Sequence, residues 1–124
     1  MDPEALVNAA RDVRARAHAP YSKFHVGAAL LAKSGALYTG VNVENSSYGL
    51  TICAERAAIC TAVTAGDLAF EAVAVVAERC VAPCGACRQV LAEFEPDLKV
   101  YLAAPDGPWR ETSLGVLLPE GFSF

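Results

Sequence analysis

Two short cysteine clusters constrain this chain more than any other feature. Cys53 stands two residues before Glu55, and Cys84 and Cys87 follow Pro83 as a C-x-x-C pair. Positions i and i+3 share one face of a helix, and a preceding proline is typical of a helix start. If both clusters open helices, the free N–H groups and dipoles there stabilise thiolates. We therefore expect a fold that brings two helix N-termini together.

Three thiolates from these clusters fit one zinc ion. A catalytic zinc site uses three protein ligands and keeps its fourth position for water. Glu55 is too close in sequence to Cys53 to be a comfortable fourth ligand, but it is well placed to carry protons. Spacing alone leaves two other interpretations open. The C-x-x-C pair can be a redox pair, or Cys80 can complete a closed four-cysteine structural zinc site.

The combined pattern favours catalysis. C-x-E followed by P-C-x-x-C is the arrangement found in zinc deaminases of nucleobases, in which the glutamate carries protons and does not bind the metal. Both halves of that pattern are present here in that order.

Length and composition limit the class of protein. The 124 residues suffice for one domain, spanning 1–124, with one core. Apolar residues make up 54%, a surplus that oligomer interfaces consume. The net charge of −4, without any basic stripe, argues against a nucleic-acid-binding surface.

The compartment is inferred from the first residues and the cysteine count. The start of the chain lacks the layout of a signal peptide, and no apolar run reaches the roughly 20 residues of a membrane span. Five cysteines, an odd number, argue against a disulfide framework. We therefore expect a cytoplasmic protein with no membrane partner.

Hydrophobic periodicity and turn residues predict helices and strands in alternation. Asp2 can cap the first helix, and Gly66 can end the second. Alternating elements imply an α/β layered domain, and an initial hairpin makes its sheet mixed. The expected helices cover 3–17, 53–65, 84–94 and a last turn at 113–118, and the expected strands cover 24–33, 36–43, 70–77 (central), 99–103 and 110–112.

Several stretches resemble the small, homotetrameric, zinc-dependent cytidine deaminases. These are PYSKFHVGAAL at 20–30, NVEN at 42–45, CAER at 53–56 and PCGACRQ at 83–89. Leu117-Leu118-Pro119 followed by Phe122 resembles the family's end, although many members continue for several residues beyond the position of Phe124. The resemblance spans nearly the whole chain, and its motifs keep the family's order.

The resemblance implies a three-layer α/β/α sandwich around a five-stranded mixed sheet. It implies hydrolytic deamination of cytidine and 2′-deoxycytidine to uridine and 2′-deoxyuridine with release of ammonia, a step of pyrimidine salvage. One zinc per subunit would be held by Cys53, Cys84 and Cys87, with zinc-bound hydroxide attacking C4 and Glu55 shuttling protons. It also implies a homotetramer with shared active sites.

The substrate contacts are carried over by position. The resemblance implies that Asn42 and Glu44 hold the ribose hydroxyls, that Phe24 packs against the pyrimidine, and that the backbone of Ala54 contacts the base. Asn42 and Glu44 alternate at a strand end, so their side chains point the same way. Tyr48 contacts either the substrate or an adjacent subunit.

Two further side chains are assigned roles near this site. Three thiolates leave the zinc site with a net negative charge, which weakens the metal as a Lewis acid. Arg56 is expected to donate hydrogen bonds to the thiolates and offset that charge, with Arg88 a weaker candidate. Because the chain end is apolar and Gly121 lets it turn, Phe122 is expected to close a neighbour's pocket.

The remaining cysteines and histidines receive no catalytic role. Cys60 is expected to be a buried small hydrophobe and Cys80 to be incidental, while His18 and His25 are not expected to bind the metal.

Two alternatives to cytidine deamination stay open. One is a deaminase of another free cytosine nucleoside, such as a nucleoside antibiotic. The other is a non-catalytic structural zinc protein. A deaminase acting on nucleic acid is disfavoured by the acidic composition.

Overall fold

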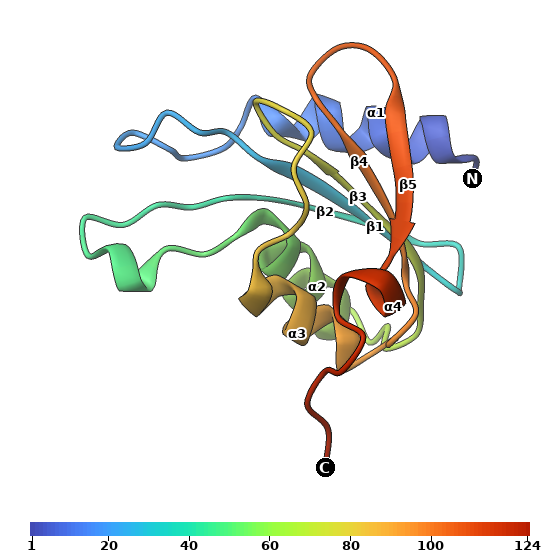
Figure 1. The fold of residues 1–124 in the computed structure, drawn as a ribbon. Helices are drawn as coiled ribbons and strands as arrows, with labels where there is room; N and C mark the ends of the chain where they lie inside the picture. The colour runs from blue at the N-terminus through green and yellow to red at the C-terminus, as the bar shows by residue number, and fades with distance from the viewer.

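The structure is a computed structural model that describes residues 1–124. Helices and strands alternate as the sequence predicts (Figure 1). In chain order the elements are α1 (Pro3–Arg14), β1 (Gly27–Ala32), β2 (Leu37–Val41), the 3-10 helix η1 (Tyr48–Leu50), α2 (Ala54–Thr64), β3 (Phe70–Val76), α3 (Gly85–Ala92), β4 (Lys99–Ala103), β5 (Trp109–Ser113) and α4 (Leu114–Leu117).

One mixed sheet runs through the molecule, with the strand order β2-β1-β3-β4-β5. β3 lies at its centre, as predicted, and only β3 and β4 run parallel. A parallel pair needs a crossover connection, and α3 supplies it. Helix α1 covers one face of the sheet, and α2, α3 and α4 cover the other (Figure 1). The expected three-layer α/β/α architecture is confirmed.

Each face of the sheet has its own apolar core. Side chains alternate along β1, so Ala28 and Leu30 face α2 and α3, while Ala29 and Leu31 face α1. Every residue of β1 is buried, as its unbroken apolar run predicts. These two cores fix the helices that carry the cysteines against the sheet.

The ends of several elements differ from the sequence prediction. α1 stops at Arg14 rather than near Ala17 because the chain turns there, and the Arg14 Nε donates to the His25 carbonyl at 2.9 Å. Strand β1 begins at Gly27 rather than at Phe24, because the Phe24 carbonyl and the Val26 N–H bond the side chain of Asn42 instead of a neighbouring strand.

Both cysteine clusters do open helices. Cys53 is the N-cap residue of α2 and Cys84 is the N-cap residue of α3. Asp2 caps α1 through a 2.7 Å bond from Ala5 N, and Gly66 follows α2 with a positive φ of 95°, both as predicted. Strand β2 lies unusually close to α2, since a Cβ placed on Gly40 would meet the Ala54 carbonyl oxygen at 2.4 Å. α2 therefore starts directly against the sheet.

Candidate metal centre and substrate cavity

The sulfurs of Cys53, Cys84 and Cys87 converge at the two helix N-termini. They all lie within 4.8 Å of one another, and the Sγ atoms of Cys53 and Cys84 are 3.9 Å apart. A zinc ion with Zn–S bonds of about 2.3 Å in tetrahedral geometry separates its sulfurs by about 3.8 Å. The donor set and its spacing therefore fit zinc with three thiolate ligands and one open position.

Cys80 lies outside this cluster and is exposed. The structure therefore does not bring a fourth cysteine to the metal centre. The expectation for Cys60 was wrong, because this thiol is exposed in the chain. It lies on α2 between buried residues such as Ile59 and Ala62 but on the outer face of the helix. His25 packs against Glu78 instead, with its Nδ1 3.5 Å from the carboxylate.

Arg56 supplies positive charge to the sulfurs. Its Nη2 donates to Cys53 Sγ at 3.4 Å, and its Nε is buried without a hydrogen-bond partner. The sulfur of Cys53, followed by that of Cys87, raises the pKa of the guanidinium. A guanidinium beside the sulfurs favours negative charge on them, and three metal-bound thiolates would supply that charge.

The pKa values of two of the thiols shift in opposite directions. Hydrogen bonds from Cys87 and then from Arg56 lower the pKa of Cys53 to about 5 against the opposing effect of burial. The pKa of Cys87 is raised, because its thiol donates to Cys53 and is buried. These hydrogen bonds favour the thiolate form of Cys53, and metal binding displaces protons from the thiols that it engages.

Glu55 lies beside the sulfurs in the first turn of α2. Its side chain is almost fully buried, with 4% exposure, and this burial raises the pKa of its carboxyl group. A buried carboxyl group whose pKa is raised is suited to acid–base work. The structure places Glu55 at the edge of a cavity together with Cys53 and Cys84.

That cavity has a volume of about 250 Å³ and mostly apolar walls. Small-molecule sites combine such walls with a few convergent polar groups, and here these are the sulfurs, Glu55, Asn42 and Thr51. The complete lining is Phe24, Val26, Asn42, Thr51, Cys53, Ala54, Glu55, Val75, Ala77, Val81, Ala82, Pro83 and Cys84. Phe24, Asn42 and Ala54, expected from the resemblance, are therefore all at the cavity.

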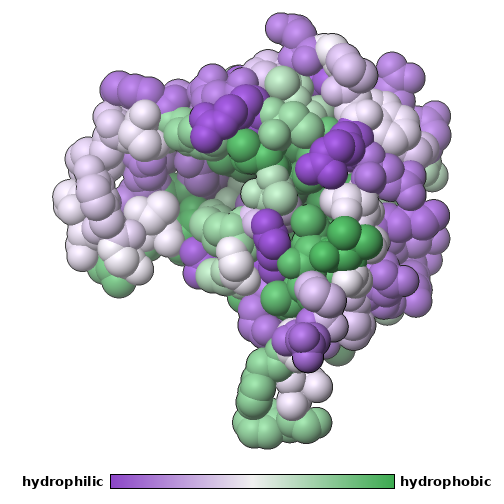
Figure 2. All heavy atoms as spheres, in the orientation of Figure 1, coloured by the Kyte–Doolittle hydropathy of each residue, from purple (hydrophilic) through white to green (hydrophobic).

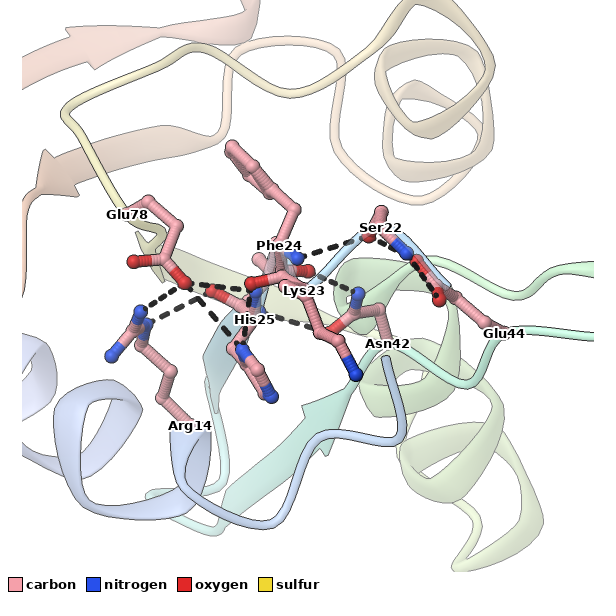
Figure 3. A network of polar contacts seen from close by, with 9 residues as sticks. Arg14, Ser22, Lys23, Phe24, His25, Asn42, Glu44 and Glu78 are labelled. Atoms are coloured by element: carbon pink, nitrogen blue, oxygen red, sulfur yellow. Dashed lines mark hydrogen bonds and ion pairs between the residues drawn. The ribbon is translucent and has the colours of Figure 1, made fainter. Parts of the chain in front are cut away.

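The side chain of Asn42 is buried, and most of its hydrogen-bonding capacity is used within the chain. Its Nδ2 donates to the Phe24 carbonyl at 2.8 Å, and its Oδ1 accepts from Val26 N at 2.9 Å (Figure 3). One N–H of the amide remains for a ligand. The Phe24 ring is flanked by the guanidinium of Arg79, whose Cζ lies 5.7 Å from the ring centroid.

Glu44 lines a neighbouring hollow with Tyr21, Ser22, Tyr48 and Thr51. Thr51 also lines the main cavity, so the two spaces adjoin. The loops that carry these residues, the one before β1 and the one around η1, project on the same side of the molecule (Figure 1). Sequence reasoning missed Thr51 and Ser22, although Ser22 lies within the matched PYSKF stretch.

Besides Glu44, two of the expected substrate residues, Tyr48 and Phe122, do not line the cavity within one chain. Tyr48 is 75% exposed and stacks edge-on against Tyr21, with ring centroids 6.2 Å apart. Phe122 is 69% exposed, and its ring packs against Phe124 on the chain end that protrudes from the body (Figure 2). Their roles remain predictions.

Comparison with known proteins identifies the family. A family model for the cytidine and deoxycytidylate deaminase zinc-binding region matches residues 1–103. The chain belongs to the cytidine and deoxycytidylate deaminase family. It is 52% identical over 126 residues to a cytidine deaminase of Sporosarcina psychrophila, covering 99% of this chain and 93% of that protein. Zinc is the metal that the cysteine cluster of this deaminase fits.

Solved structures agree with this membership. The crystal structure of cytidine deaminase from Burkholderia pseudomallei has a TM-score of 0.94 and 50% identity, and the match covers 98% of this deaminase and 100% of that chain. A more distant relative is a blasticidin-S deaminase of Bacillus cereus, 33% identical over 79% of this chain and 76% of that protein. None of the helices has the length and apolar character needed to cross a membrane.

Proposed function

We propose that this deaminase converts cytidine and 2′-deoxycytidine to uridine and 2′-deoxyuridine by hydrolysis, releasing ammonia. The observation that carries the proposal is the buried Glu55 beside three convergent cysteine sulfurs at an apolar cavity. Roughly 50% identity to cytidine deaminases over nearly the full chain supports the same substrate class.

Cys53, Cys84 and Cys87 would hold zinc, which supplies a Lewis acid that makes water nucleophilic near neutral pH. Glu55 takes a proton from the attacking water and delivers it to N3 of the pyrimidine. Protonation of N3 makes C4 electrophilic, so the oxygen of water adds there. Glu55 then moves the second proton of that water to the exocyclic nitrogen, which leaves as ammonia.

The charge and the walls of the site assist these proton transfers. The Arg56 guanidinium next to Cys53 Sγ withdraws negative charge from the sulfurs. Once a neighbour's Phe122 closes the pocket, its apolar walls keep bulk water away, so the carboxyl group of Glu55 exchanges protons with the substrate rather than with solvent.

Residues from the loop before β1, from the loop that follows β2 and from the start of α2 hold the nucleoside. Phe24 packs against the pyrimidine, and the backbone of Ala54 contacts the base. The free N–H of Asn42 and the carboxylate of Glu44 bind ribose hydroxyls. Both residues lie on the segment that follows β2. Asn42 lines the cavity and Glu44 lines the adjoining hollow, and Thr51 lines both.

The active protein is a homotetramer with shared active sites, and residues 1–124 form one deaminase domain in each subunit. Large exposed apolar side chains, including Tyr48, Leu50, Val116 and Phe122, support this assembly. In it, Phe122 closes a neighbour's pocket, and Tyr48 contacts the substrate or the adjacent subunit. Five free thiols, three of them ligands, need a reducing compartment, so we place the protein in the cytoplasm.

A second candidate substrate is another free cytosine nucleoside, such as a nucleoside antibiotic. The similarity to a blasticidin-S deaminase supports this second candidate. Turnover of cytidine, 2′-deoxycytidine and blasticidin S under the same conditions separates the candidates. We expect the two natural nucleosides to be converted far faster.

The decisive experiment follows the ultraviolet change as cytidine becomes uridine, with zinc measured on the same sample. X-ray absorption at the zinc edge should show three sulfurs and one oxygen. Four sulfurs together with no turnover would instead identify a structural zinc protein with a closed site.

A further inference from the structure

The hydroxyl group of Ser22 connects two residues of the proposed substrate site. Its Oγ donates to the Oε2 of Glu44 and accepts from the N–H of Phe24 at 2.9 Å (Figure 3). Glu44 is proposed to bind the ribose, and Phe24 is proposed to pack against the base. One hydroxyl group therefore fixes the spacing between a group that faces the sugar and the backbone of a residue that faces the pyrimidine.

The carboxylate of Glu44 is held at both oxygens. Oε1 accepts the backbone N–H groups of Tyr21 at 3.0 Å and Ser22 at 3.2 Å, which use both of its lone pairs. Oε2 accepts only the Ser22 hydroxyl within the chain. The remaining lone pair on Oε2 is therefore the one available to a donor from a ligand. The hydrogen bond from Ser22 also lowers the pKa of Glu44, so the carboxylate is ionised and accepts only.

The backbone at this turn has an uncommon conformation next to the Ser22 hydroxyl group. Lys23, between Ser22 and Phe24, has φ of 62° and is the only residue other than glycine with a positive φ. Such a conformation is costly for a residue with a side chain and persists where its surroundings fix it. On the other side, Asn42 Nδ2 holds the Phe24 carbonyl at 2.8 Å. Ser22 and Asn42 thus clamp Phe24 from both ends.

We propose that Ser22 is a positioning residue for the nucleoside, which holds Glu44 so that Oε2 accepts a ribose hydroxyl. This inference rests on the proposed function. Ser22 itself does not take part in the proton transfers, which occur at Glu55. Loss of its hydroxyl therefore weakens sugar binding while leaving the chemical step intact.

The test compares Ser22→Ala with two other variants. Ser22→Thr keeps a hydroxyl group. Ser34→Ala is the matched control, because Ser34 Oγ also donates to a carboxylate, that of Asp67 at 3.1 Å, and accepts the N–H two residues later at 3.3 Å. It lies in the turn between β1 and β2, outside the lining of the cavity and of the adjoining hollow. All variants are assayed for zinc content and thermal unfolding before kinetics.

The substrates are cytidine and 2′,3′-dideoxycytidine, which lacks both hydroxyls on the ring of the sugar. For cytidine, Ser22→Ala should raise KM about tenfold, the scale of one hydrogen bond to a charged group, with kcat within about twofold. For the dideoxy substrate, the rise in KM should be much smaller, because Asn42 still holds the Phe24 carbonyl and no ribose hydroxyl is present to bind Glu44. Ser22→Thr should restore most of the affinity, and Ser34→Ala should behave as wild type. In a Glu44→Gln background, adding Ser22→Ala should have much less effect.

The outcomes separate the two proposals. A wild-type protein that binds zinc but does not deaminate cytidine would refute the proposed function. An active wild type with an equal rise in KM for both substrates in Ser22→Ala would mean that Ser22 only shapes the turn. An unchanged KM for cytidine in that variant would also overturn the positioning role.

Discussion

Gln89 and Phe122 exchange two hydrogen bonds across a separation of 33 residues. Gln89 Nε2 donates to the Phe122 carbonyl at 2.8 Å, and the Phe122 N–H donates to Gln89 Oε1 at 3.1 Å. Gln89 lies on α3, two residues after the candidate ligand Cys87. The side chain of Arg88 donates to the carbonyls of Pro83 and Leu117. The chain end is therefore tied to α3, at whose N-terminus two of the candidate zinc ligands lie.

Removing residues 120–124 tests the shared-site proposal. A chain ending at Pro119 should keep its zinc, because no ligand is lost, but it should lose most activity if Phe122 closes a neighbour's pocket. Light scattering, zinc analysis and kinetics on the same sample measure the three properties. Gln89→Ala should act in the same direction, and Ser123→Ala is the control. A full-length protein that is monomeric and fully active would contradict the proposal.

The three candidate ligands should differ sharply from the other two cysteines. Cys53→Ala, Cys84→Ala and Cys87→Ala should each lose zinc and much stability, because the metal joins helices separated in sequence. Cys60→Ala and Cys80→Ala should retain zinc, since both thiols are exposed and outside the cluster. Removal of zinc from the wild type by a chelator should lower its thermal midpoint. Zinc loss in Cys80→Ala would favour the closed four-cysteine site.

Glu55→Gln should keep its zinc and fold but turn over cytidine about 10²–10⁴ times more slowly, the range typical of general acid–base catalysis. The glutamine fills nearly the same buried volume, so a loss of activity is not attributable to a cavity. Glu55→Ala should show at least the same loss. Near-normal turnover in either variant would exclude Glu55 as the proton carrier.

Arg56→Ala should retain zinc but slow the reaction, because the sulfurs would then keep their full negative charge and weaken the metal as a Lewis acid. Arg56→Gln keeps a hydrogen-bond donor without the charge, so its rate should fall between those of wild type and Arg56→Ala. Steady-state kinetics over a range of pH measure this order. Identical rates and pH profiles in all three proteins would remove Arg56 from this role.

Glu78 should give the protein a stability that depends on acid pH. The His25 backbone N–H, followed by the charge of Arg14, lowers the pKa of Glu78 from its usual 4.5, and Arg14 Nη2 lies 2.8 Å from the carboxylate. A lowered folded-state pKa stabilises the protein above the unfolded-state pKa, and this contribution disappears as pH falls through the folded value. Glu78→Gln should therefore be less stable than wild type at pH 7.

The difference in unfolding free energy between wild type and Glu78→Gln should shrink as the pH drops below about 4.5. Urea titrations of the two proteins in the same metal state measure it at each pH. Glu71→Gln, at an exposed position of β3, is the control for the same substitution away from Arg14 and His25. A difference that is constant from pH 7 to pH 3 would refute the linkage.

The sequence predicted most of the strands and the convergence of three cysteine sulfurs because the signals for them are local. Unbroken apolar runs identified β1 and β3, and the spacing of Cys84 and Cys87 identified a helix start. The extent of β1 was misjudged because Phe24 and Val26 bond the side chain of Asn42, a contact between distant segments. Periodicity along one segment carries no information about such a partner.

The errors at Cys60 and the omission of Ser22 have related causes. α2 is rich in alanine, so its two faces differ little in hydrophobicity. The sequence therefore did not distinguish the exposed face that carries Cys60 from the buried face. Ser22 acts through Glu44, which lies 22 residues away. Only the folded chain brings the two side chains together.

Gly40 has a consequence for any attempt to redesign this enzyme by directed evolution. A methyl group there would lie 2.4 Å from the Ala54 carbonyl oxygen and 2.5 Å from the Ala58 nitrogen, so α2 would have to move away from the sheet. Cys53 and Glu55 would move with α2, whereas Cys84 and Cys87 on the other helix would not. Gly40 lines neither the cavity nor the cysteine cluster. It nevertheless sets the distance between the residues at the start of α2 and the cysteines at the start of α3. Libraries that randomise the cavity should therefore keep position 40 as glycine.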